Sequence, residues 1–447
     1  MASKKPRIIA VQILENIEHK GAYANLELNA VKQKSELSSQ EFSFLTELVY
    51  GVIQNKRLID YYLSPFLKKT QKLKSWVRQV IRVAVYQMVF LDNIPDYASI
   101  NEAVNYGGKR GHKGIRSLIN GVLRNFQRQD LKPVSDIESL EVRLAIQYSM
   151  PDWLIKEFLK QYGAETTEKM LKSFNKRAKV SIRVATKRIS IEEATEELEA
   201  SGYEVKRSEL SPEGLIILNG LPIDHSLYKK GLISIQDESS MMVAPSLNVS
   251  TDHVVADLCA APGGKTSHIA TFIDSSMGGI LYSSDLHDHK IPLIQKTLKR
   301  QGLNNCVQVR QLDATQAGQV YDNDMFDRVL IDAPCSGIGL LRRKPDIRFA
   351  KEPKNLKSLP TLQLAILEEA ASLVKAGGEM VYSTCTILEA ENQTVIKTFL
   401  EKHPEFKLKK IDIDNDLFKH NNGELLILPH YYDSDGFYIA LLVKESD

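Results

Sequence analysis

The feature that most constrains the fold is a regular alternation of short apolar runs and helix-like stretches after residue 240. Five runs rich in Val, Ile and Leu are predicted to be strands, and each ends in small or polar residues: VVADL, GGILYSSD, CVQVRQLD, RVLIDAP and EMVYST. Strands that alternate with helices form a parallel, doubly wound sheet with helices on both faces. We therefore predict an α/β domain over residues 241–447, with functional side chains at the carboxyl ends of the strands.

The other residues are predicted to form further domains, because 447 residues exceed what one hydrophobic core holds. A helical period of apolar residues over 1–130 predicts an all-helical domain, and 131–175 is predicted to be a linker followed by helices. Alternating apolar residues after residue 179 predict a small α+β module over 176–240. The chain has no apolar run of about 18 residues, so we expect no membrane span.

The first 130 residues carry 20 Lys and Arg against 11 Asp and Glu, whereas the remainder carries 38 against 45. This local excess of positive charge favours an anionic partner such as nucleic acid over a merely solvated surface. The segment GGKRGHKGIRS is predicted to be a basic, glycine-rich loop whose backbone N–H groups hold phosphate at a helix start; the alternative is a plain interhelical loop. Its candidate nucleic-acid contacts are Lys109, Arg110, Lys113 and Arg116.

Two of the four cysteines follow directly after predicted strands: Cys335 in RVLIDAPCSGIG and Cys385 in EMVYSTCTILEAEN. The cysteines show no CxxC spacing, so we expect neither a metal site nor a disulfide framework, and we expect a reducing, cytoplasmic compartment. A lone free cysteine is usually an inert core residue. Two thiols at adjacent strand ends, beside Asp332, instead favour covalent chemistry on an electrophilic substrate.

The loop within VVADLCAAPGGKTSHIA is predicted to bind a nucleotide-like cofactor, because its small residues allow close approach before a helix N-terminus. The loop matches neither the GxGxxG fingerprint nor the GxxxxGK[ST] P-loop. Asp285 ends the next strand and is predicted to accept hydrogen bonds from ribose hydroxyls, with a surface acid as the alternative. Asp313 ends the following strand and is predicted to bind an adenine amino group, with a helix N-cap as the alternative.

Three strings resemble motifs of the RNA cytosine-5 methyltransferases that use S-adenosylmethionine, the Nop2/Sun/RsmB family: DLCAAPGGKT, DAPCSG and YSTCTILEAEN. In the helical N-terminus, INEAVNYG and LINGVLRN resemble the NusB antitermination domain, which precedes the catalytic domain in the bacterial 16S rRNA methyltransferases of this family. The resemblance implies a NusB-like domain, a small RNA-recognition module and a Rossmann-like class I methyltransferase domain with a mostly parallel, seven-stranded sheet. The terminal DSDGFYIALLVK is similar to the last, antiparallel hairpin of that sheet.

The resemblance also implies roles for individual residues. Cys385 would be the nucleophile that attacks C6 of cytosine, Cys335 would help release the product, and Asp332 would make an acidic contact at N3. The chemistry by itself leaves the two thiol roles interchangeable. The residues implied to bind S-adenosylmethionine are Cys259, Ala260, Ala261, Pro262, Gly263, Gly264, Lys265, Asp285, Asp313 and Asp332.

Further cations follow Cys335 in LLRRKPDIRF, where we predict RNA contacts at the active-site mouth, with a solvated charged turn as the alternative: Arg342, Arg343, Lys344 and Arg348. We expect a monomer that methylates C5 of a cytosine in 16S rRNA, with RNA as its partner and no metal. The alternatives are a tRNA or 23S rRNA cytosine-5 methyltransferase and a non-catalytic RNA-binding factor. An N6-adenine methyltransferase would need a DPPY-type motif where this chain has DAPC.

Overall fold

A computed structural model describes residues 6–67, 73–350 and 356–446 of the chain. The chain divides into two compact units, of which the first comprises residues 1–175 and 343–352 and the second comprises 176–342 and 353–447. Among the described residues, no helix is long and apolar enough to cross a membrane. Each unit is described by itself below.

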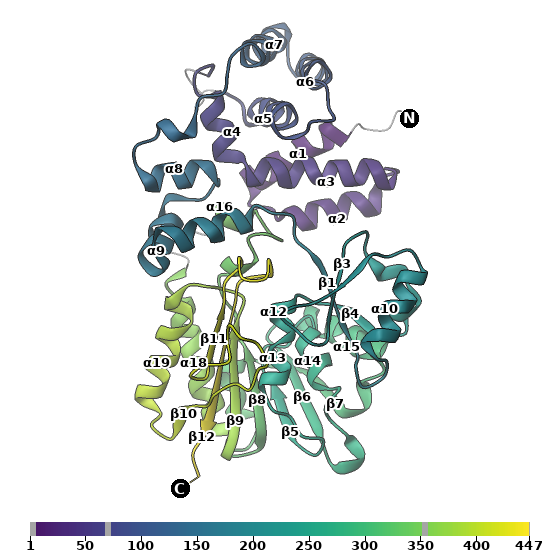
Figure 1. Cartoon of the computed structure of the whole chain (residues 1–447), viewed down its shortest axis with the longest axis vertical. Coiled ribbons are helices and arrows are strands. Elements are labelled where there is room, and N and C mark those ends of the chain that lie inside the picture. Colours follow the sequence, from purple (N-terminus) through teal and green to yellow (C-terminus); the bar gives the residue numbers. More distant parts are fainter. Residues whose placement is uncertain (1–5, 68–72, 351–355, 447) are drawn as a thin grey trace. The chain divides into compact units, whose positions relative to one another are not determined.

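The described part of the first unit is helical, and its helices between residues 6 and 127 pack around one apolar core (Figure 1). Helix α5 is the most buried of them, with apolar residues on every side of its middle turns. A capping box in which Ser38 and Glu41 exchange hydrogen bonds fixes the start of α3. The helices are α1 (Pro6–Lys20), α2 (Ala24–Lys34), α3 (Ser39–Gln54), α4 (Lys56–Leu63), α5 (Ser75–Phe90), α6 (Asp96–Arg110), α7 (Lys113–Gln127), α8 (Leu140–Gln147), α9 (Asp152–Phe174) and α16 (Ile347–Ala350).

The glycine-rich segment between α6 and α7 differs from its prediction. Gly107 lies inside α6, and only Gly111 and His112 connect the two helices. A Cβ atom on Gly107 would lie 2.4 Å from Cδ1 of Ile119 on α7, so this glycine lets the two helices approach closely. The structure therefore supports the alternative of a short interhelical connection, and it gives the glycines a packing role.

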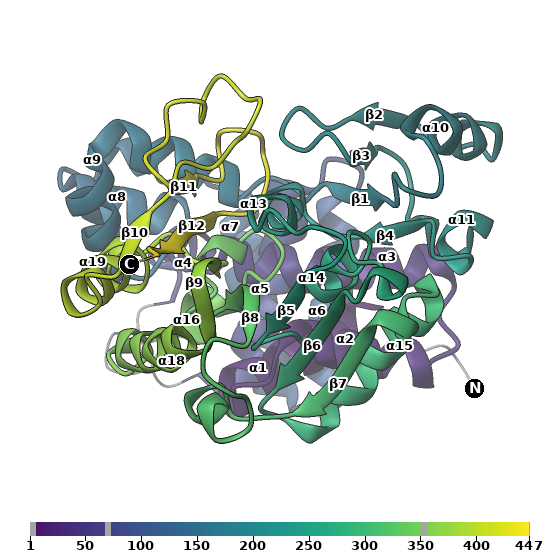
Figure 2. The same ribbon diagram turned by 90° about the horizontal axis from the view of Figure 1, so that it is seen from below.

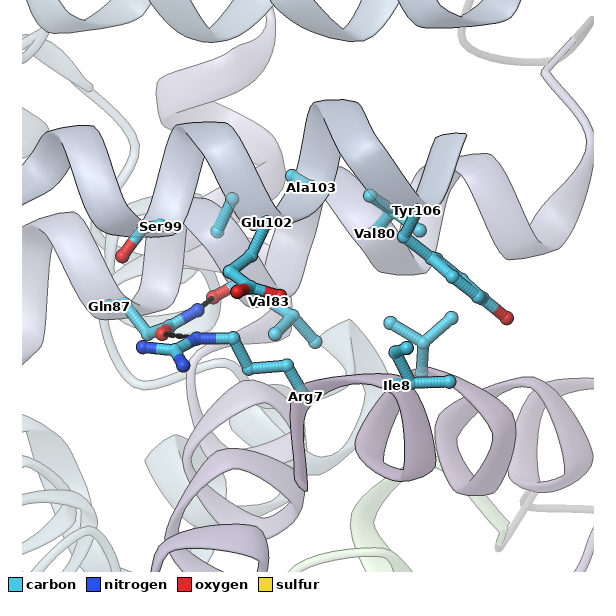
Figure 3. A pocket seen from close by; sticks show the side chains of 11 residues that line it. Arg7, Ile8, Val80, Val83, Gln87, Ser99, Glu102, Ala103 and Tyr106 are labelled. Carbon is cyan, nitrogen blue, oxygen red and sulfur yellow. Dashed lines mark hydrogen bonds between the residues drawn. The ribbon is translucent and has the colours of Figure 1, made fainter. Parts of the chain in front are cut away.

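A small cavity of about 20 Å³ lies among α1, α5 and α6 (Figure 3). The Arg7 guanidinium donates from Nε to Oε1 of Gln87 at 2.7 Å, and Gln87 donates to the Val83 carbonyl at 2.8 Å. A volume of this size holds about one water molecule and excludes a nucleotide. This cavity therefore belongs to the packing of the helices.

The segment 343–350 joins the first unit through Arg348, whose side chain is 0% exposed. Its Nη1 donates to the carbonyl oxygens of Gln54 at 3.2 Å and Tyr148 at 3.1 Å, and to Oδ1 of Asn175 at 3.1 Å. These acceptors lie at the C-terminal ends of α3, α8 and α9, where backbone carbonyls lack helical partners and a cation is favoured. Burial lowers the pKa of Arg348 to about 9.

The predicted RNA contact of Arg348 is therefore wrong, because its guanidinium is enclosed by three helix ends. Nothing in the local sequence distinguishes this arginine from its exposed neighbour Lys344. The partners of Arg348 lie more than 170 residues away along the chain, so only the tertiary fold identifies them.

In the second unit, residues 176–240 form a four-stranded antiparallel sheet in the order β2-β3-β1-β4. A capping box between Ser190 and Glu193 starts the helix beside it. The apolar side chains of β1 and β3 and of this helix form a separate small core. The elements are β1 (Val180–Val184), α10 (Ile191–Ala200), β2 (Val205–Arg207), β3 (Gly214–Ile217), α11 (Ser226–Lys229), β4 (Ile233–Ile235) and α12 (Glu238–Met241).

The remainder of the second unit is built on an eight-stranded sheet in the order β10-β12-β9-β8-β5-β6-β7, with β11 paired to β12. Strands β5 to β9 pair in parallel, and β12 is antiparallel to β9, β10 and β11. The elements are α13 (Val243–Ser246), β5 (Val254–Asp257), α14 (Gly264–Ile269), β6 (Ile280–Asp285), α15 (Ile291–Gln301), β7 (Val307–Gln311), β8 (Phe326–Asp332), α18 (Leu359–Leu373), β9 (Val374–Thr384), α19 (Gln393–Lys402), β10 (Phe406–Leu408), β11 (Glu424–Ile427) and β12 (Phe437–Lys444).

Helices cover both faces of this sheet (Figure 2). Along β8, Val329 and Ile331 pack into the core with α18 and α19, whereas Leu330 packs into the core with α13, α14 and α15. This alternation is the period-two pattern of a strand buried on both faces. The doubly wound α/β prediction is confirmed, and β11 adds one strand to the seven expected.

Replacing Arg348 with Ala is expected to lower the free energy of unfolding of the first unit by about 3 kcal/mol, because buried helix-end acceptors lose a charged donor. Both tryptophans of the chain, Trp76 and Trp153, lie in this unit, so their fluorescence during urea unfolding reports it selectively. The exposed neighbour Lys344 provides the control, and Lys344→Ala is expected to change the stability by less than about 0.5 kcal/mol. Equal stabilities of the two variants would contradict this account of Arg348.

Candidate active site

The parallel pairing of β8 and β9 places the two cysteines with predicted catalytic roles side by side. In this register Asp332 pairs with Ser383, and each chain then leaves the sheet at the same edge. Cys335 lies three residues beyond Asp332, and Cys385 lies two residues beyond Ser383. Their Sγ atoms are 3.4 Å apart, and both side chains are partly exposed. Both sulfurs are therefore within reach of the same substrate atoms.

The two cysteine loops are joined by backbone contacts that require glycine. The N–H of Gly339 donates to the carbonyl oxygen of Cys385 at 3.0 Å, and the N–H of Gly436 donates to the carbonyl oxygen of Gly339 at 2.9 Å. A Cβ atom on Gly339 would lie 1.9 Å from the Gly436 oxygen and 2.8 Å from the Cys385 oxygen. A larger residue at position 339 would thus force the loops apart.

Asp332 forms a charged cluster beside the sulfurs. Its Oδ2 accepts a hydrogen bond from Lys265 Nζ at 2.7 Å, and its Oδ1 accepts one from Ser383 Oγ at 2.9 Å. Both bonds suit an ionised carboxylate. Burial opposes the charge of Lys265, but the carboxylate of Asp332 and the sulfur of Cys385 favour it, so the pKa of Lys265 lies above its ordinary value. The proton-bearing member of this pair is therefore Lys265.

The surroundings of the two thiols differ in charge. The hydrogen bond to the Cys385 sulfur, followed by burial and by the charges of Cys385 and Glu391, raises the pKa of Cys335 well above its ordinary value. Cys385 instead interacts with the Lys265 cation, and this attraction favours the thiolate form. The raised pKa keeps Cys335 in the thiol form, and the Lys265 cation stabilises negative charge that develops on Cys385.

The predicted cofactor loop lies at the carboxyl end of β5, directly before α14. Gly263 adopts a φ of +97°, and a Cβ atom there would lie 3.1 Å from the Cα of Ile294. The loop therefore needs glycine both for its backbone angle and for its contact with α15. Cys259 is partly exposed, and burial, together with the nearby carboxylates of Asp257 and Asp332, raises its pKa well above the ordinary value, which favours the unreactive thiol form.

Asp285 and Asp313 lie at the ends of β6 and β7, as predicted from their spacing. Asp285 is 6% exposed and accepts the backbone N–H groups of Ala261 at 3.2 Å and His287 at 3.1 Å. It thereby ties the cofactor loop to β6. Asp313 accepts the N–H and hydroxyl of Thr315 through Oδ1, which is the helix N-cap that was its alternative interpretation.

Asp257, the last residue of β5, has no role in the predictions made from the sequence. This carboxyl is 0% exposed, and its Oδ2 accepts a hydrogen bond from the Thr266 hydroxyl at 2.7 Å. Burial raises the pKa of Asp257 to about 7. Like Asp285 and Asp332 on the neighbouring strands, Asp257 lies at the end of its strand. This shared position is the sequence feature from which Asp257 could have been identified as a candidate.

The predicted RNA-binding cations divide into exposed and buried groups. Lys109, Arg110, Lys113, Arg116 and Lys344 are exposed, and Arg343 is half-buried. Arg342, by contrast, is 4% exposed and donates to the backbone carbonyls of Pro429 and Asp433. Its predicted RNA contact is wrong for the same reason as that of Arg348, since backbone carbonyls already surround the guanidinium.

Comparison with known sequences places this geometry in a family. The model of the family described as 16S rRNA methyltransferase RsmB/F matches residues 244–443, the NusB family matches 4–128, and the RsmF/B-like ferredoxin-like domain matches 150–224. A Bacillus subtilis (strain 168) protein named "Probable ribosomal RNA small subunit methyltransferase B" is 42% identical over 450 residues, covering 100% of both chains. The chain belongs to the RsmB/RsmF methyltransferase family.

Other relatives extend the RsmB/RsmF likeness over the whole chain. Ribosomal RNA small subunit methyltransferase B of Klebsiella pneumoniae is 30% identical, with 98% of both chains covered. The crystal structure of PH0851 superposes with a TM-score of 0.80 at 31% identity and covers 99% of both chains. NSun6 from Pyrococcus horikoshii, at 23% identity, shares the fold over 66% of this chain and 99% of its own, with a TM-score of 0.58. The resemblance predicted from the motifs is confirmed.

The buried carboxyl of Asp257 predicts a pH dependence of stability. Its folded pKa of about 7 exceeds the ordinary value of 3.8, so the folded chain binds this proton more tightly than the unfolded chain. The stabilisation is complete below about pH 4 and is lost as the pH rises towards 7, by up to about 4 kcal/mol. Asp257→Asn keeps an acceptor for the Thr266 hydroxyl, but its free energy of unfolding should not show this fall with pH.

The measurement is urea unfolding followed by circular dichroism between about pH 4 and 8. The free energy of unfolding of the wild type, relative to that of Asp257→Asn, should fall as the pH rises across this range. A difference that stays constant with pH would show that Asp257 ionises normally.

Proposed function

We propose that this RsmB/RsmF methyltransferase transfers the methyl group of S-adenosylmethionine to C5 of a cytosine in 16S rRNA. The observation that carries the proposal is the pair of Cys335 and Cys385 sulfurs 3.4 Å apart, with a cation beside one of them. Methylation at C5 needs a thiolate that adds at C6, since the ring carbon alone is too weak a nucleophile. The family description and the names of the full-length relatives support rRNA as the substrate class.

The residues at the ends of β5 and β6 fit an adenosine-containing methyl donor. The buried carboxylate of Asp285 lies beside the loop and suits ribose hydroxyls, while Gly264, whose Cβ position meets nothing within 4 Å, leaves room for close approach to the backbone. Asp313 would lie on the adenine side, using the carboxylate oxygen that does not cap the following helix. When bound, S-adenosylmethionine supplies an electrophilic methyl group on a sulfonium.

The charges around the sulfurs support a division of the steps between the two thiols. The Cys385 thiolate, favoured by Lys265, would form the bond from Sγ to C6, and the displaced electron pair would move towards N3. In the proposed complex, Asp332 and the Lys265 ammonium would lie at this edge of the base, and the proton that Lys265 carries would supply the hydrogen bond at N3. After C5 has taken the methyl group, a base, with solvent water as the simplest candidate, would accept the C5 proton; the C5–H electron pair would re-form the C5=C6 double bond, and the C6–Sγ bond would break to release Cys385 as a thiolate. Cys335 adjoins Cys385 and would assist this release.

The exposed cations supply candidate phosphate contacts. Lys109 and Arg110 end α6, and Lys113 and Arg116 begin α7, so the four form one basic patch on the first unit. Such contacts contribute affinity without base specificity and weaken as salt increases. Arg343 and Lys344 are also candidate phosphate contacts, whereas the buried Arg342 and Arg348 are not.

Single substitutions of the two cysteines test the reaction. Cys385→Ala is expected to lose methylation by at least about 1,000-fold and to form no protein–RNA adduct, because no bond to C6 can form. Cys335→Ala should retain the attack but accumulate a covalent adduct on a denaturing gel. An adduct that persists in Cys385→Ala and is missing in Cys335→Ala would reverse the assigned roles.

The substrate is tested by bisulfite mapping of rRNA and tRNA from a strain that lacks the gene. We expect one 5-methylcytosine to disappear from 16S rRNA and to return when the wild-type gene, but not the Cys385→Ala gene, is supplied. Loss of a tRNA or 23S rRNA methylation, with 16S rRNA unchanged, would overturn the substrate class and leave the chemistry intact.

A further inference from the structure

One buried carboxylate contacts the residue that follows each cysteine. Glu391 is 1% exposed, and its Oε2 accepts the backbone N–H of Ser336 at 2.8 Å. The hydroxyl of Thr386 donates to Oε1 of the same carboxylate at 3.3 Å. Ser336 directly follows Cys335, and Thr386 directly follows Cys385. The Ser336 hydroxyl also donates to the Thr386 hydroxyl at 2.9 Å, which closes a three-membered network.

The backbone around Glu391 is fixed to β9, the strand that leads into Cys385. The Tyr382 hydroxyl donates to the Glu391 carbonyl oxygen at 2.7 Å, and the Thr384 hydroxyl donates to Oδ1 of Asn392 at 2.6 Å. Asn392 in turn donates to the Thr386 carbonyl oxygen at 3.0 Å. The Glu391 carboxylate therefore has a defined place relative to Cys385, and the Cys335 loop is the part that it holds.

Burying the Glu391 carboxylate costs free energy, which indicates that this side chain has a specific structural role. An enclosed carboxylate is unfavourable unless several donors satisfy it, and Glu391 has Ser336, Thr386 and the buried amide of Gln363 at 3.1 Å. A hydrogen bond from a backbone N–H to an ionised oxygen is about twice as strong as a neutral one and sets the loop position tightly. The network thus provides directional restraint at the point where the two loops meet.

We propose that Glu391 is a positioning residue: its carboxylate fixes the Cys335 loop against the Cys385 loop, so that both sulfurs face one substrate base. This inference rests on the proposed roles of the two thiols, and it names the group that enforces their separation. The negative charge of Glu391 has a second effect in the same direction. After the Cys385 hydrogen bond, burial and the Cys385 charge, it helps to raise the pKa of Cys335, which keeps the proton on the releasing thiol.

A chemical measurement of sulfur proximity tests the positioning without RNA or methyl donor. Diamide takes up two protons and two electrons from a pair of adjacent thiols, which become a disulfide, and peptide mapping by mass spectrometry follows the Cys335–Cys385 bond. Glu391→Ala is expected to slow its formation by at least about tenfold, because the Cys335 loop loses its restraint. Glu391→Asp should also slow it, since the carboxylate retreats by one methylene.

Two further substitutions calibrate the effect. Glu391→Gln keeps nearly the same shape but replaces the charge-assisted hydrogen bonds with weaker neutral ones, so its rate of disulfide formation should fall between those of the wild type and Glu391→Ala. Glu389→Gln removes an exposed carboxylate from the same turn and should have no effect. Circular dichroism verifies that each variant is folded, and Glu391→Asp and Glu391→Gln still decide the question if Glu391→Ala does not fold.

Steady-state kinetics provide the second readout. In Glu391→Ala the KM values for RNA and S-adenosylmethionine should stay near those of the wild type, while kcat falls by at least about tenfold and the protein–RNA adduct accumulates. Unchanged disulfide formation in both Glu391→Ala and Glu391→Asp would overturn the positioning role even if methylation falls. Slowed disulfide formation with no methylation by the wild type would instead overturn the proposed function and leave the positioning role supported.

Discussion

The chemistry of this chain depends on the parallel pairing of β8 with β9. Their register places Asp332 opposite Ser383, and the two loops that leave the sheet at this point bring Cys335 and Cys385 together. A shift of one residue in the pairing would turn the side chains of one strand to the other face of the sheet. Because cores on both faces fix the register, the separation of the two sulfurs is a consequence of burying the sheet.

Charge then distinguishes two thiols that geometry makes nearly equivalent. The Lys265 ammonium interacts with Cys385, whereas the Glu391 carboxylate, which contacts the residues after both cysteines, helps to raise the pKa of Cys335. Lys265 comes from the loop proposed to bind the methyl donor and pairs with Asp332 at the end of β8, so the same loop contributes the cation that interacts with the proposed nucleophile. The raised pKa of Cys335 is consistent with the roles that the family resemblance implies.

Much of this arrangement is predictable from the sequence because it depends on strand ends. Parallel strands present their carboxyl ends at one edge, so the positions of Asp285, Asp332, Cys335 and Cys385 follow from the strand pattern alone. Asp313 shows the limit of this reasoning, since the same position also suits a helix N-cap and the structure uses it as one.

Interactions between distant parts of the chain escaped prediction. Arg342 and Arg348 lie in a charged stretch that suggests a solvated or RNA-binding turn, yet both are enclosed by carbonyl oxygens from remote segments. No local sequence pattern predicts that residues 343–352 belong to the first unit, because this too depends on contacts with distant segments. Glu391 lies within the string YSTCTILEAEN, but the sequence does not reveal its contact with the Cys335 loop, which exists only in the folded chain.

The electrostatics around the two sulfurs favour a thiolate on Cys385 and keep Cys335 protonated. The rate of iodoacetamide alkylation of each cysteine as a function of pH, resolved by peptide mass spectrometry, measures this difference directly. We expect Cys385 to become reactive at a lower pH than Cys335, and Lys265→Met to bring the two pH profiles closer together. Equal pH profiles for the two thiols, or earlier reaction of Cys335, would contradict it.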